Sequence, residues 1–474
     1  MTFPPPSTGT VPSLRPVAHF TARDTWLNDP NGLLFHDGTY HLFFQNNPQG
    51  STWGEISWGH ATSTDLVTWQ EQEVAIWATD DEMAFSGSAV VDSQNTSGLA
   101  GPGETALVAV YTSAARPRAG TPGVQSQSLA YSVDAGATWT RYAGNPVLDI
   151  GSTEFRDPKV FWFDAETAAD GSPGEGQGHW VMVAVEAVDR RVVLYTSPDL
   201  LSWTYVSAFG PAHATGGVWE CPDLFPLAVQ ETGETRWVLV VSLNPGGIAG
   251  GSGSQYFVGD FDGTTFVAER LSTSTDPADH DWLDYGRDYY AAVSFNHVPD
   301  GRRLMVGWAS NWEYANETPT APWRSAMSLV REVDLVRGAD GRHRVRQHPV
   351  LPPAEVLPGV FELSVPCGAG DRTALVLTGD DGGSDRLVLT VDGDERSITC
   401  DRTQSGAVDF HPAFPSVDWA PLPVGADDVV DVVVVVDATV VEVYVGGGLV
   451  TLTEQVFPSS PFTRLDREVL STAG

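Results

Sequence analysis

Ser63-Thr64-Asp65-Leu66-Val67-Thr68-Trp69 is a turn of a kind that recurs along this chain. Ser132–Trp139 and Ser197–Trp203 repeat its Ser-x-Asp…Trp pattern, and Asp260–Phe266 is a degenerate fourth copy. The copies are spaced by roughly 65 residues, which is enough for a four-stranded sheet with a long loop, as in one blade of a β-propeller. Five such units would fill residues 18–345, so the repeat predicts a five-bladed β-propeller.

Short apolar runs between these turns favour an all-β chain. They are rich in β-branched and aromatic residues and are separated by Gly, Pro and Asp turns, which is typical of strands. The clearest runs are Thr39–Gln45, Leu107–Tyr111, Trp180–Val185, Trp237–Ser242 and Leu304–Ala309. Few stretches of helical period and length compete with them.

A second domain is expected because 474 residues exceed the size at which one core normally keeps growing. Residues 346–358 are rich in proline and are interpreted as a connector. Regularly spaced short strands follow it and predict a C-terminal β-sandwich over residues 359–474. These strands are Thr373–Thr378, Arg386–Val391, Val429–Val436 and Val440–Val445.

The formal net charge of −35 argues against nucleic acid or an anionic membrane as a partner. Three cysteines make no disulfide framework, and Cys367 and Cys400 would pair only if the tail brought them together in an oxidising compartment. No spacing resembles a zinc site. Three acidic residues in the Gly-rich turns of the tail are interpreted as solvated loop charges: Asp380, Asp381 and Asp385. We therefore expect no metal and no cofactor.

The first residues, Met1–Leu14, contain neither a basic n-region nor an apolar h-region. The most apolar run, Val429–Val436, is short and is interrupted by Asp431, so it is interpreted as a strand and not as a membrane span. A cytoplasmic protein is expected. A signal removed beforehand would leave the same sequence, and the protein would then be secreted.

Three carboxylates lie in similar surroundings although they are far apart in the sequence. Each belongs to a short, proline-stiffened turn flanked by an aromatic residue: Trp26-Leu27-Asn28-Asp29-Pro30-Asn31-Gly32, Phe155-Arg156-Asp157-Pro158-Lys159 and Trp219-Glu220-Cys221-Pro222-Asp223. A retaining glycosidase needs one carboxylate as nucleophile and another as general acid/base, and a third can share the developing charge. An Asn-Asp-Pro-Asn-Gly turn alone is ordinary punctuation, but the set of three indicates a glycosidase.

These segments resemble the signature of glycoside hydrolase family 32, which contains the invertases, inulinases and levanases. Leu27 stands where the family pattern Trp-Met-Asn-Asp-Pro-Asn-Gly has methionine. The resemblance covers most of residues 18–350 and implies a five-bladed propeller followed by a β-sandwich. Further segments similar to those of the family, in the expected order, are Phe44–Pro48, Trp53–His60, Phe85–Ser88, Asn244–Gly247 and Asp284–Tyr290.

The resemblance implies a role for each carboxylate. Asp29 would be the nucleophile that attacks the anomeric carbon of a terminal β-fructofuranosyl unit. Glu220 would protonate the departing oxygen and then deprotonate water, and Asp157 would stabilise the transition state. Cys221 is interpreted as a small buried neighbour of the site, and Arg156 as a group that keeps Asp157 ionised and donates to a fructosyl hydroxyl.

Fructose carries several hydroxyl groups and no charge, so its pocket needs neutral donors and acceptors together with apolar walls. Asn28, Gln45 and Ser86 meet the first need in matching family segments. Trp53, Phe85 and Trp312 meet the second. With Arg156, these residues and Asp288 are the expected contacts to the sugar.

Residues 307–315 and 319–324 resemble the exo-acting inulinases and levanases more than the sucrose-specialised invertases. We therefore expect an exo-acting, retaining β-fructofuranosidase that acts on fructans, fructo-oligosaccharides and sucrose. Asn46, where many relatives carry an aromatic residue, leaves the preferred linkage open. The sequence does not specify the oligomeric state.

Three alternatives stay open. A fructosyltransferase or a difructose-forming enzyme would share the same intermediate and differ only in the attacking group. A fructan-binding propeller without catalysis is disfavoured because all three carboxylates are present. An arabinan-active relative that works by inversion is disfavoured by the context of Asp29.

Overall fold

The computed structural model describes residues 14–118, 122–164, 178–380, 382–423 and 428–470. The residues before 14, on which the expectation about a secretion signal depends, lie outside this range, as does Asp381. Among the described residues, no helix is long and apolar enough to span a membrane. The helices there are two short 3-10 turns, Pro277–Asp279 and Pro299–Gly301, and the prediction of an all-β chain is confirmed.

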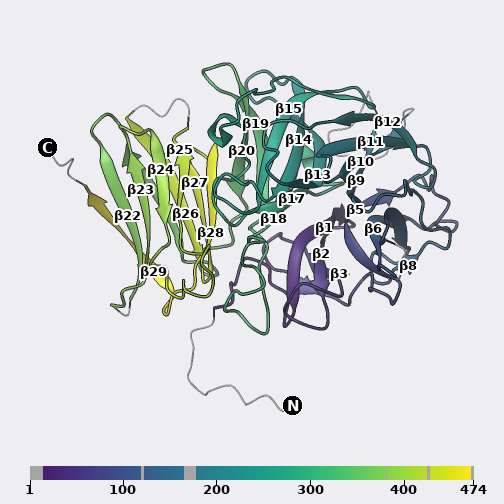
Figure 1. Cartoon of the computed structure of the whole chain (residues 1–474), viewed down its shortest axis with the longest axis horizontal. Helices are drawn as coiled ribbons and strands as arrows, with labels where there is room; N and C mark the ends of the chain where they lie inside the picture. The colour runs from purple at the N-terminus through teal and green to yellow at the C-terminus, as the bar shows by residue number, and fades with distance from the viewer. Residues whose placement is uncertain (1–13, 119–121, 165–177, 381, 424–427, 471–474) are drawn as a thin grey trace, which may run out of the picture.

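Five four-stranded antiparallel sheets follow one another through residues 26–349 of the described chain (Figure 1). The first contains β1 (Trp26–His36), β2 (Thr39–Asn47), β3 (Ser57–Ser63) and β4 (Gln70–Glu71), and the second contains β5 (Glu82–Asp92), β6 (Ala106–Ala115), β7 (Gln125–Ser132) and β8 (Thr140–Arg141). The third contains β9 (Phe155–Phe163), β10 (His179–Glu186), β11 (Arg191–Ser197) and β12 (Thr204–Phe209), and the fourth β13 (Val218–Ala228), β14 (Thr235–Asn244), β15 (Gly253–Phe261) and β16 (Phe266–Ala268). The fifth contains β17 (Tyr290–Ser294), β18 (Arg303–Trp308), β19 (Arg331–Arg337) and β20 (His343–Pro349).

The first strands of these sheets form a closed circle. β1 contacts β5, β5 contacts β9, β9 contacts β13, β13 contacts β17, and β17 returns to β1. A circle of sheets that meet along their first strands is consistent with a propeller, in which the inner strands surround the axis.

The repeated Ser-x-Asp turn joins the third and fourth strands of the first four sheets. In the first copy the Asp65 carboxylate accepts hydrogen bonds from the backbone N–H groups of Val67 and Thr68 at 2.9 and 2.7 Å. Asp134, Asp199 and Asp262 accept equivalent bonds in the other copies. An aspartate side chain that accepts backbone bonds in this way closes a tight turn, which explains why the motif recurs once in each of these four sheets.

The C-terminal part contains two sheets that share one core, at the left of Figure 1. One sheet consists of β21 (Val360–Pro366), β26 (Val429–Asp437), β27 (Val440–Val445) and β28 (Val450–Gln455). The other consists of β22 (Arg372–Gly379), β23 (Arg386–Asp392), β24 (Ser397–Asp401), β25 (Val417–Pro421) and β29 (Phe462–Val469). Alternate residues such as Leu375, Leu389 and Val434 point between the sheets, as in a β-sandwich. Cys367 and Cys400 are buried thiols in this core.

The predicted connector begins too early. β20 continues through residues 346–349, because Arg346 and Gln347 pair with Asp334 and Val333 of β19. Pro349 is tolerated there because β20 is an edge strand and a missing N–H costs little at its end.

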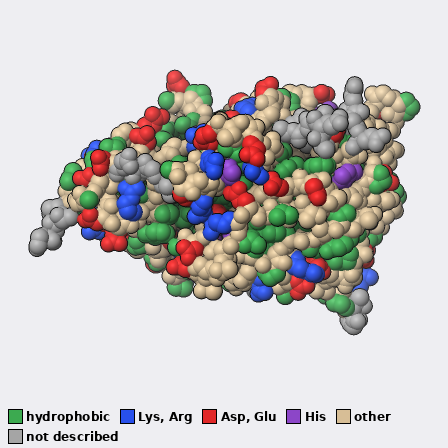
Figure 2. All heavy atoms as spheres, turned by 90° about the horizontal axis from the view of Figure 1, so that it is seen from above, with side chains coloured by type: hydrophobic (Ala, Val, Ile, Leu, Met, Phe, Trp, Pro, Cys, Tyr) green, Lys and Arg blue, Asp and Glu red, His purple; other side chains and the backbone are tan. Residues whose placement is uncertain are grey.

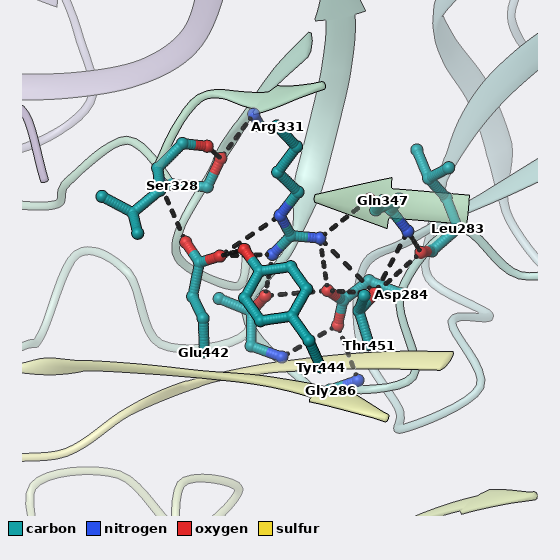
Figure 3. A network of polar contacts seen from close by, with 12 residues as sticks. Leu283, Asp284, Gly286, Ser328, Arg331, Gln347, Glu442, Tyr444 and Thr451 are labelled. Carbon is teal, nitrogen blue, oxygen red and sulfur yellow. Dashed lines mark hydrogen bonds and ion pairs between the residues drawn. The ribbon is translucent and has the colours of Figure 1, made fainter. Parts of the chain in front are cut away.

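A buried polar network joins the sandwich to the fifth sheet (Figure 3). Arg331 of β19 is fully buried and pairs with Asp284 at 3.0 Å and with Glu442 of β27 at 2.9 Å. Its guanidinium lies 4.1 Å from the ring centroid of Tyr289 and 5.2 Å from that of Tyr444. A cation buried in this manner is held by paired charges and aromatic faces on both sides of the boundary.

Basic and acidic groups lie close together on part of the surface. Basic groups on the face drawn in Figure 2 lie mostly beside acidic ones. The β19–β20 hairpin carries two such pairs: Arg344 with Asp340 and Arg346 with Asp334, each at 2.6 Å. Exposed pairs of this kind contribute little to stability.

Candidate active site

The three predicted carboxylates lie on first strands of three different sheets: Asp29 on β1, Asp157 on β9 and Glu220 on β13. Each strand carries one extra residue relative to its neighbour at this point, between Leu27 and Pro30, between Arg156 and Lys159, and between Glu220 and Asp223. β5 and β17 are bulged at the same end. A β-bulge turns side chains away from the regular alternation, and here it brings separate carboxylates to one end of the circle.

The position of the proline in each of the three motifs is explained by the local backbone. Pro30, Pro158 and Pro222 lie within or at the edge of these bulges. Proline cannot donate to a ladder, so inside a sheet it is confined to edges and bulges. The Asp-Pro and Cys-Pro pairs therefore mark the irregular backbone that positions the carboxylates.

Asp157 and Cys221 both have left-handed backbone conformations, with φ angles of 61° and 46°. Such angles are uncommon for residues with a side chain and persist where the surroundings impose them. Here Asp157 N–H donates to the Thr112 hydroxyl at 3.0 Å, and Cys221 N–H donates to the Asp157 carboxylate at 2.9 Å. The strained residues therefore fix one another across two strands.

Asp29 is buried and surrounded by donors. The Ser86 hydroxyl donates to Oδ2 at 2.6 Å and the Asn28 amide to Oδ1 at 3.1 Å. Trp26 orients that amide by donating its indole N–H to the Asn28 oxygen at 2.7 Å. Burial raises the pKa of Asp29 and the charge of Glu220 raises it further, while the bonds from Ser86 and Asn28 act in the opposite direction. The donors favour the ionised form that a nucleophile requires.

Cys221 connects two of the carboxylates. Its sulfur lies 3.4 Å from Asp29 Oδ2 and 3.7 Å from Asp157 Oδ2. Burial, followed by the charges of Asp29 and Asp157, raises the pKa of the Cys221 thiol well above its ordinary value. The sulfur therefore stays protonated and acts as a donor and spacer, in agreement with its interpretation as a buried neighbour.

Glu220 has a different environment from the other two carboxylates. Its side chain is 22% exposed, whereas that of Asp157 is 6% exposed. Arg156 donates to Oε1 from Nε at 3.2 Å, and its Nη2 lies 3.1 Å from the same oxygen. The Tyr290 hydroxyl donates to Oε2 at 2.5 Å. A carboxyl group that reaches water while two donors hold its orientation suits proton exchange.

Tyr290 was not predicted as a site residue. Burial, followed by the charge of Glu220, raises the pKa of Tyr290 well above the ordinary value, so its hydroxyl stays protonated and donates a hydrogen bond to Glu220. The only sequence signal for this residue was its position at the end of the segment Asp284–Tyr290.

Asp157 is a buried carboxylate with a raised pKa. Burial raises its pKa to about 7, and the charges of Glu220 and Asp29 act in the same direction. Arg156 lowers this pKa as expected, but its Nε lies 4.0 Å from Asp157 and its closer contacts are with Glu220 and Glu154. The guanidinium of Arg156 therefore contacts Glu220 more closely than Asp157.

The predicted sugar contacts fall into three groups. Asn28 and Ser86 donate hydrogen bonds directly to the Asp29 carboxylate. Gln45 is buried and donates to the Ala84 carbonyl at 3.1 Å. The aromatic residues are Trp53, which is 42% exposed and edge-on to Phe85 at 6.1 Å, and Trp312, which packs on Trp26 and Trp308 at 6.0 and 4.8 Å.

Asp288 has a different place from the one expected. Its side chain is fully buried, and its oxygens accept bonds from the Tyr314 hydroxyl at 2.6 Å and from Arg402 of the sandwich at 2.5 Å. The structure therefore assigns Asp288 to the boundary with the sandwich and not to a sugar contact. No local pattern around Asp288 could reveal a partner more than a hundred residues away.

Together these features define a class of enzyme. One buried carboxylate surrounded by donors, a second that is partly exposed and oriented by Arg156 and Tyr290, and a third buried beside the first match the needs of glycoside hydrolysis through a covalent intermediate. The chain matches the description "Glycosyl hydrolases family 32 N-terminal domain" over residues 19–349 and "Glycosyl hydrolases family 32 C terminal" over residues 354–469. It belongs to this family and is a glycoside hydrolase.

Individual relatives agree with this assignment. The chain is 43% identical to a levanase of Bacillus subtilis over 94% of its own length and 66% of that protein. It is 40% identical to an extracellular exo-inulinase of Aspergillus niger, over 96% of this chain and 91% of that one. Invertase 2 of Saccharomyces cerevisiae is 43% identical, over 68% of this chain and 58% of the invertase. These relatives support an exo-acting β-fructofuranosidase.

Solved structures show the same fold. The exo-inulinase from Aspergillus awamori superimposes with a TM-score of 0.84 at 37% identity and covers 97% of this chain and 96% of that one. The β-fructofuranosidase from Schwanniomyces occidentalis complexed with fructosyl-erythritol gives a TM-score of 0.83 at 31% identity, with coverages of 96% and 94%.

Proposed function

We propose that this chain removes terminal, non-reducing β-D-fructofuranosyl residues from fructans, fructo-oligosaccharides and sucrose with retention of configuration. The observation that carries the proposal is the environment of Asp29, whose two oxygens accept bonds from Ser86 and Asn28 while Cys221 holds it beside Asp157. The levanase and exo-inulinase relatives support the choice of fructans, and the invertase supports sucrose.

In the first step, one carboxylate oxygen of Asp29 attacks the anomeric carbon. The bond from that carbon to the glycosidic oxygen breaks, and Glu220 transfers its proton to the departing oxygen. The product is a fructosyl ester of Asp29. Asp157 accepts hydrogen bonds from fructosyl hydroxyls, which strengthen as positive charge develops on the ring.

In the second step, water attacks the same carbon from the face that the leaving group vacated. Glu220, now ionised, takes the proton of this water, and the Asp29 carboxylate is released. Two inversions at one carbon give retention. Arg156 and Tyr290 hold Glu220 in one orientation through both proton transfers.

We also propose that the five four-stranded sheets form a five-bladed propeller that ends with β20 at Pro349, and that β21 to β29 form a separate sandwich. The closed circle of contacts from β1 through β5, β9, β13 and β17 supports five blades. The shared core of the last two sheets supports a separate sandwich.

The decisive experiment is a product time course on sucrose, inulin and levan with the wild-type enzyme, Asp29→Asn and Glu220→Ala. From inulin and levan, free fructose should appear alone from the start, whereas sucrose should give glucose and fructose in equal amounts. The first-formed anomer of the fructose should be β. Asp29→Asn should lose at least about 10⁴-fold in kcat while remaining folded. Glu220→Ala should lose about 10²- to 10⁴-fold and regain part of its activity with azide or with a substrate that has a good leaving group.

Each rival predicts a different result. Early oligosaccharides or cyclic difructose would indicate a transferase or a difructose-forming enzyme. An inverted first product would indicate an arabinan-type mechanism. Binding without any turnover would indicate a fructan-binding propeller without catalysis. Near-normal activity of Asp29→Asn would show that Asp29 is not the nucleophile.

A further inference from the structure

Two adjoining hollows run along the first sheet. One has a volume of about 420 Å³ and includes Arg15, Phe20 and Trp69 in its lining. The other has a volume of about 400 Å³ and includes Asn46 and Trp77. Arg23 and Glu71 line both hollows, so together they form one depression, which we call the first-sheet trough.

The trough opens at the end of the first sheet that carries the nucleophile. Asn46, in the wall of the trough, pairs with Leu27 of β1. Asp29 lies two residues further along that strand, so the Cα atoms of Leu27 and Asp29 are about 7 Å apart. Trp77 reaches the same end, because its neighbour Ile76 pairs with Trp58 at the beginning of β3. The trough therefore continues the catalytic end of β1 outward.

Trp77 supplies an aromatic platform in this trough. Its side chain is 53% exposed, which is unusual for the largest apolar residue in a chain with ample cores. Its backbone carbonyl accepts a bond from Arg141 at 2.6 Å, and Ala78 N–H donates to the Ser57 hydroxyl at 2.8 Å. A large apolar ring held outward by a fixed backbone is a surface on which the C–H face of a sugar ring can pack.

Polar groups surround the platform. Gln72 and Glu73 are exposed beside it and offer donors and acceptors to hydroxyl groups. The wall is rigid, because Asn46 donates to the Thr25 hydroxyl at 2.8 Å and to the Trp26 carbonyl at 2.7 Å. Arg23 is the one cation lining this second hollow, which also has Asp24, Glu71 and Glu73, so the charge disfavours an anion and suits a neutral sugar.

We propose that the first-sheet trough binds the part of a fructan chain that lies beyond the residue being removed, with Trp77 as its main contact. The inference rests on the proposed function and adds a second binding region for long substrates. Sucrose ends one sugar beyond the cleaved bond and does not extend into the trough. Binding energy from Trp77 therefore favours polymers over sucrose.

The test compares Trp77→Ala with Trp419→Ala, because Trp419 is an exposed tryptophan of similar exposure (40%) on β25 of the sandwich. The value of kcat/KM is measured for each variant on levan, inulin, short fructo-oligosaccharides and sucrose. Trp77→Ala should lose about fivefold to tenfold on the polymers, mainly through KM, the size of one lost aromatic contact. Its activity on sucrose and that of Trp419→Ala on every substrate should stay within about twofold of wild type.

Wild-type activity of Trp77→Ala on levan and inulin would overturn the proposal. An equal loss on sucrose and polymer would also overturn it, because Trp77 would then support the catalytic centre and not a distant sugar. Failure of the proposed function is distinguishable, since the wild-type enzyme would then release no fructose from any of these substrates.

A binding measurement provides the second readout. In the inactive Asp29→Asn background, calorimetry with long inulin oligosaccharides should show weaker binding when Trp77→Ala is added. Sucrose should bind the single and the double variant alike. Equal affinity of the two variants for the long oligosaccharides would exclude the trough as a binding region.

Discussion

At the scale of single residues, the site depends on three carboxyl groups that share one neighbourhood but differ in surroundings. Asp29 is buried with three donors on its oxygens, Asp157 is buried with few, and Glu220 is partly exposed. Like charges in a confined space cannot all ionise freely, so each environment decides which group carries a proton. The three groups therefore differ in hydrogen bonding and exposure more than in residue type.

Asp157→Asn tests how much the burial of this carboxyl group changes the unfolding free energy. The folded-state pKa of Asp157, about 7, lies above its ordinary value of 3.8, so folding favours the protonated form. Its stabilising contribution is complete below about pH 4 and is lost as the pH rises to about 7. The amide that replaces this carboxyl does not titrate, so the variant should gain up to a few kcal/mol relative to wild type across this range, while losing activity.

Urea unfolding of both proteins at several pH values measures this difference. Asp262→Asn is the control, because Asp262 is an exposed turn residue whose pKa is lowered by bonds from Thr264. That variant should show no such gain. A stability difference between Asp157→Asn and wild type that does not change with pH would contradict the assignment of a raised pKa.

At the scale of elements, the bulged first strands are the part that builds the site. A regular strand would point alternate side chains to opposite faces, and the extra residue in each first strand breaks that alternation. The bulge between Phe85 and Gly87 in β5 leaves Ser86 in position to donate to Asp29. The catalytic geometry is therefore a property of backbone irregularities shared by neighbouring strands.

Gly87→Ala should damage the β5 bulge. A Cβ at this position would lie 2.1 Å from the Val110 carbonyl oxygen and 2.8 Å from the Tyr111 Cα, so backbone has to move. We expect a loss of about 1–3 kcal/mol in unfolding free energy and a loss of kcat, because Ser86 shifts away from Asp29. Thermal unfolding and sucrose hydrolysis measure the two effects.

Gly216→Ala is the matched control. Gly216 is exposed, and the nearest atom to an added Cβ is at 3.4 Å, an ordinary contact. Its stability and activity should stay near those of wild type. Wild-type behaviour of Gly87→Ala would show that β5 accommodates a side chain and that the bulge does not position Ser86.

The strands were predictable to a useful degree because their signal is local. Leu107–Tyr111 and Trp180–Val185 fall within β6 and β10, since alternating and continuous apolar runs reflect burial directly. The end of β20 was not predictable from local sequence. Proline is typical of a connector, and nothing near Pro349 indicates that this residue pairs with Arg331 of β19.

At the scale of the whole molecule, the sandwich is attached by buried charge. His19, close to the beginning of the described chain, lies between two acids of the sandwich, with Nδ1 2.9 Å from Asp437 and Nε2 3.1 Å from Glu442. Glu442 in turn pairs with Arg331 (Figure 3). Breaking one member of such a network leaves an uncompensated buried charge, so the parts hold each other in register.

His19→Gln should weaken this attachment in a pH-dependent manner. Burial alone would lower the pKa of His19, but its hydrogen bonds to Asp437 and Glu442 outweigh burial and raise the pKa from 6.5 to about 9. The stabilisation is therefore complete below about pH 6.5 and is lost as the pH rises through about 9. The variant should be less stable than wild type by about 3 kcal/mol at pH 6, and the difference should narrow above pH 9.

Denaturant unfolding of His19→Gln and wild type between these pH values tests the expectation. His348→Gln is the control, because His348 is a half-exposed partner of Asp334 at 3.6 Å, and surface pairs contribute little. An equal loss of stability in His19→Gln at both ends of the range would show that the ring packs there without its charge.

The sequence by itself determined the strands, the turns that repeat along the first four sheets, and the identity of the three carboxylates. These depend on local patterns, because burial, proline and Asx turns act over a few residues. Only the tertiary structure decided that Tyr290 and Arg156 hold Glu220, that Cys221 separates Asp29 from Asp157, and that Asp288 belongs to Arg402. Such contacts join strands that are far apart in the chain, and no local pattern records which side chains a bulge brings together.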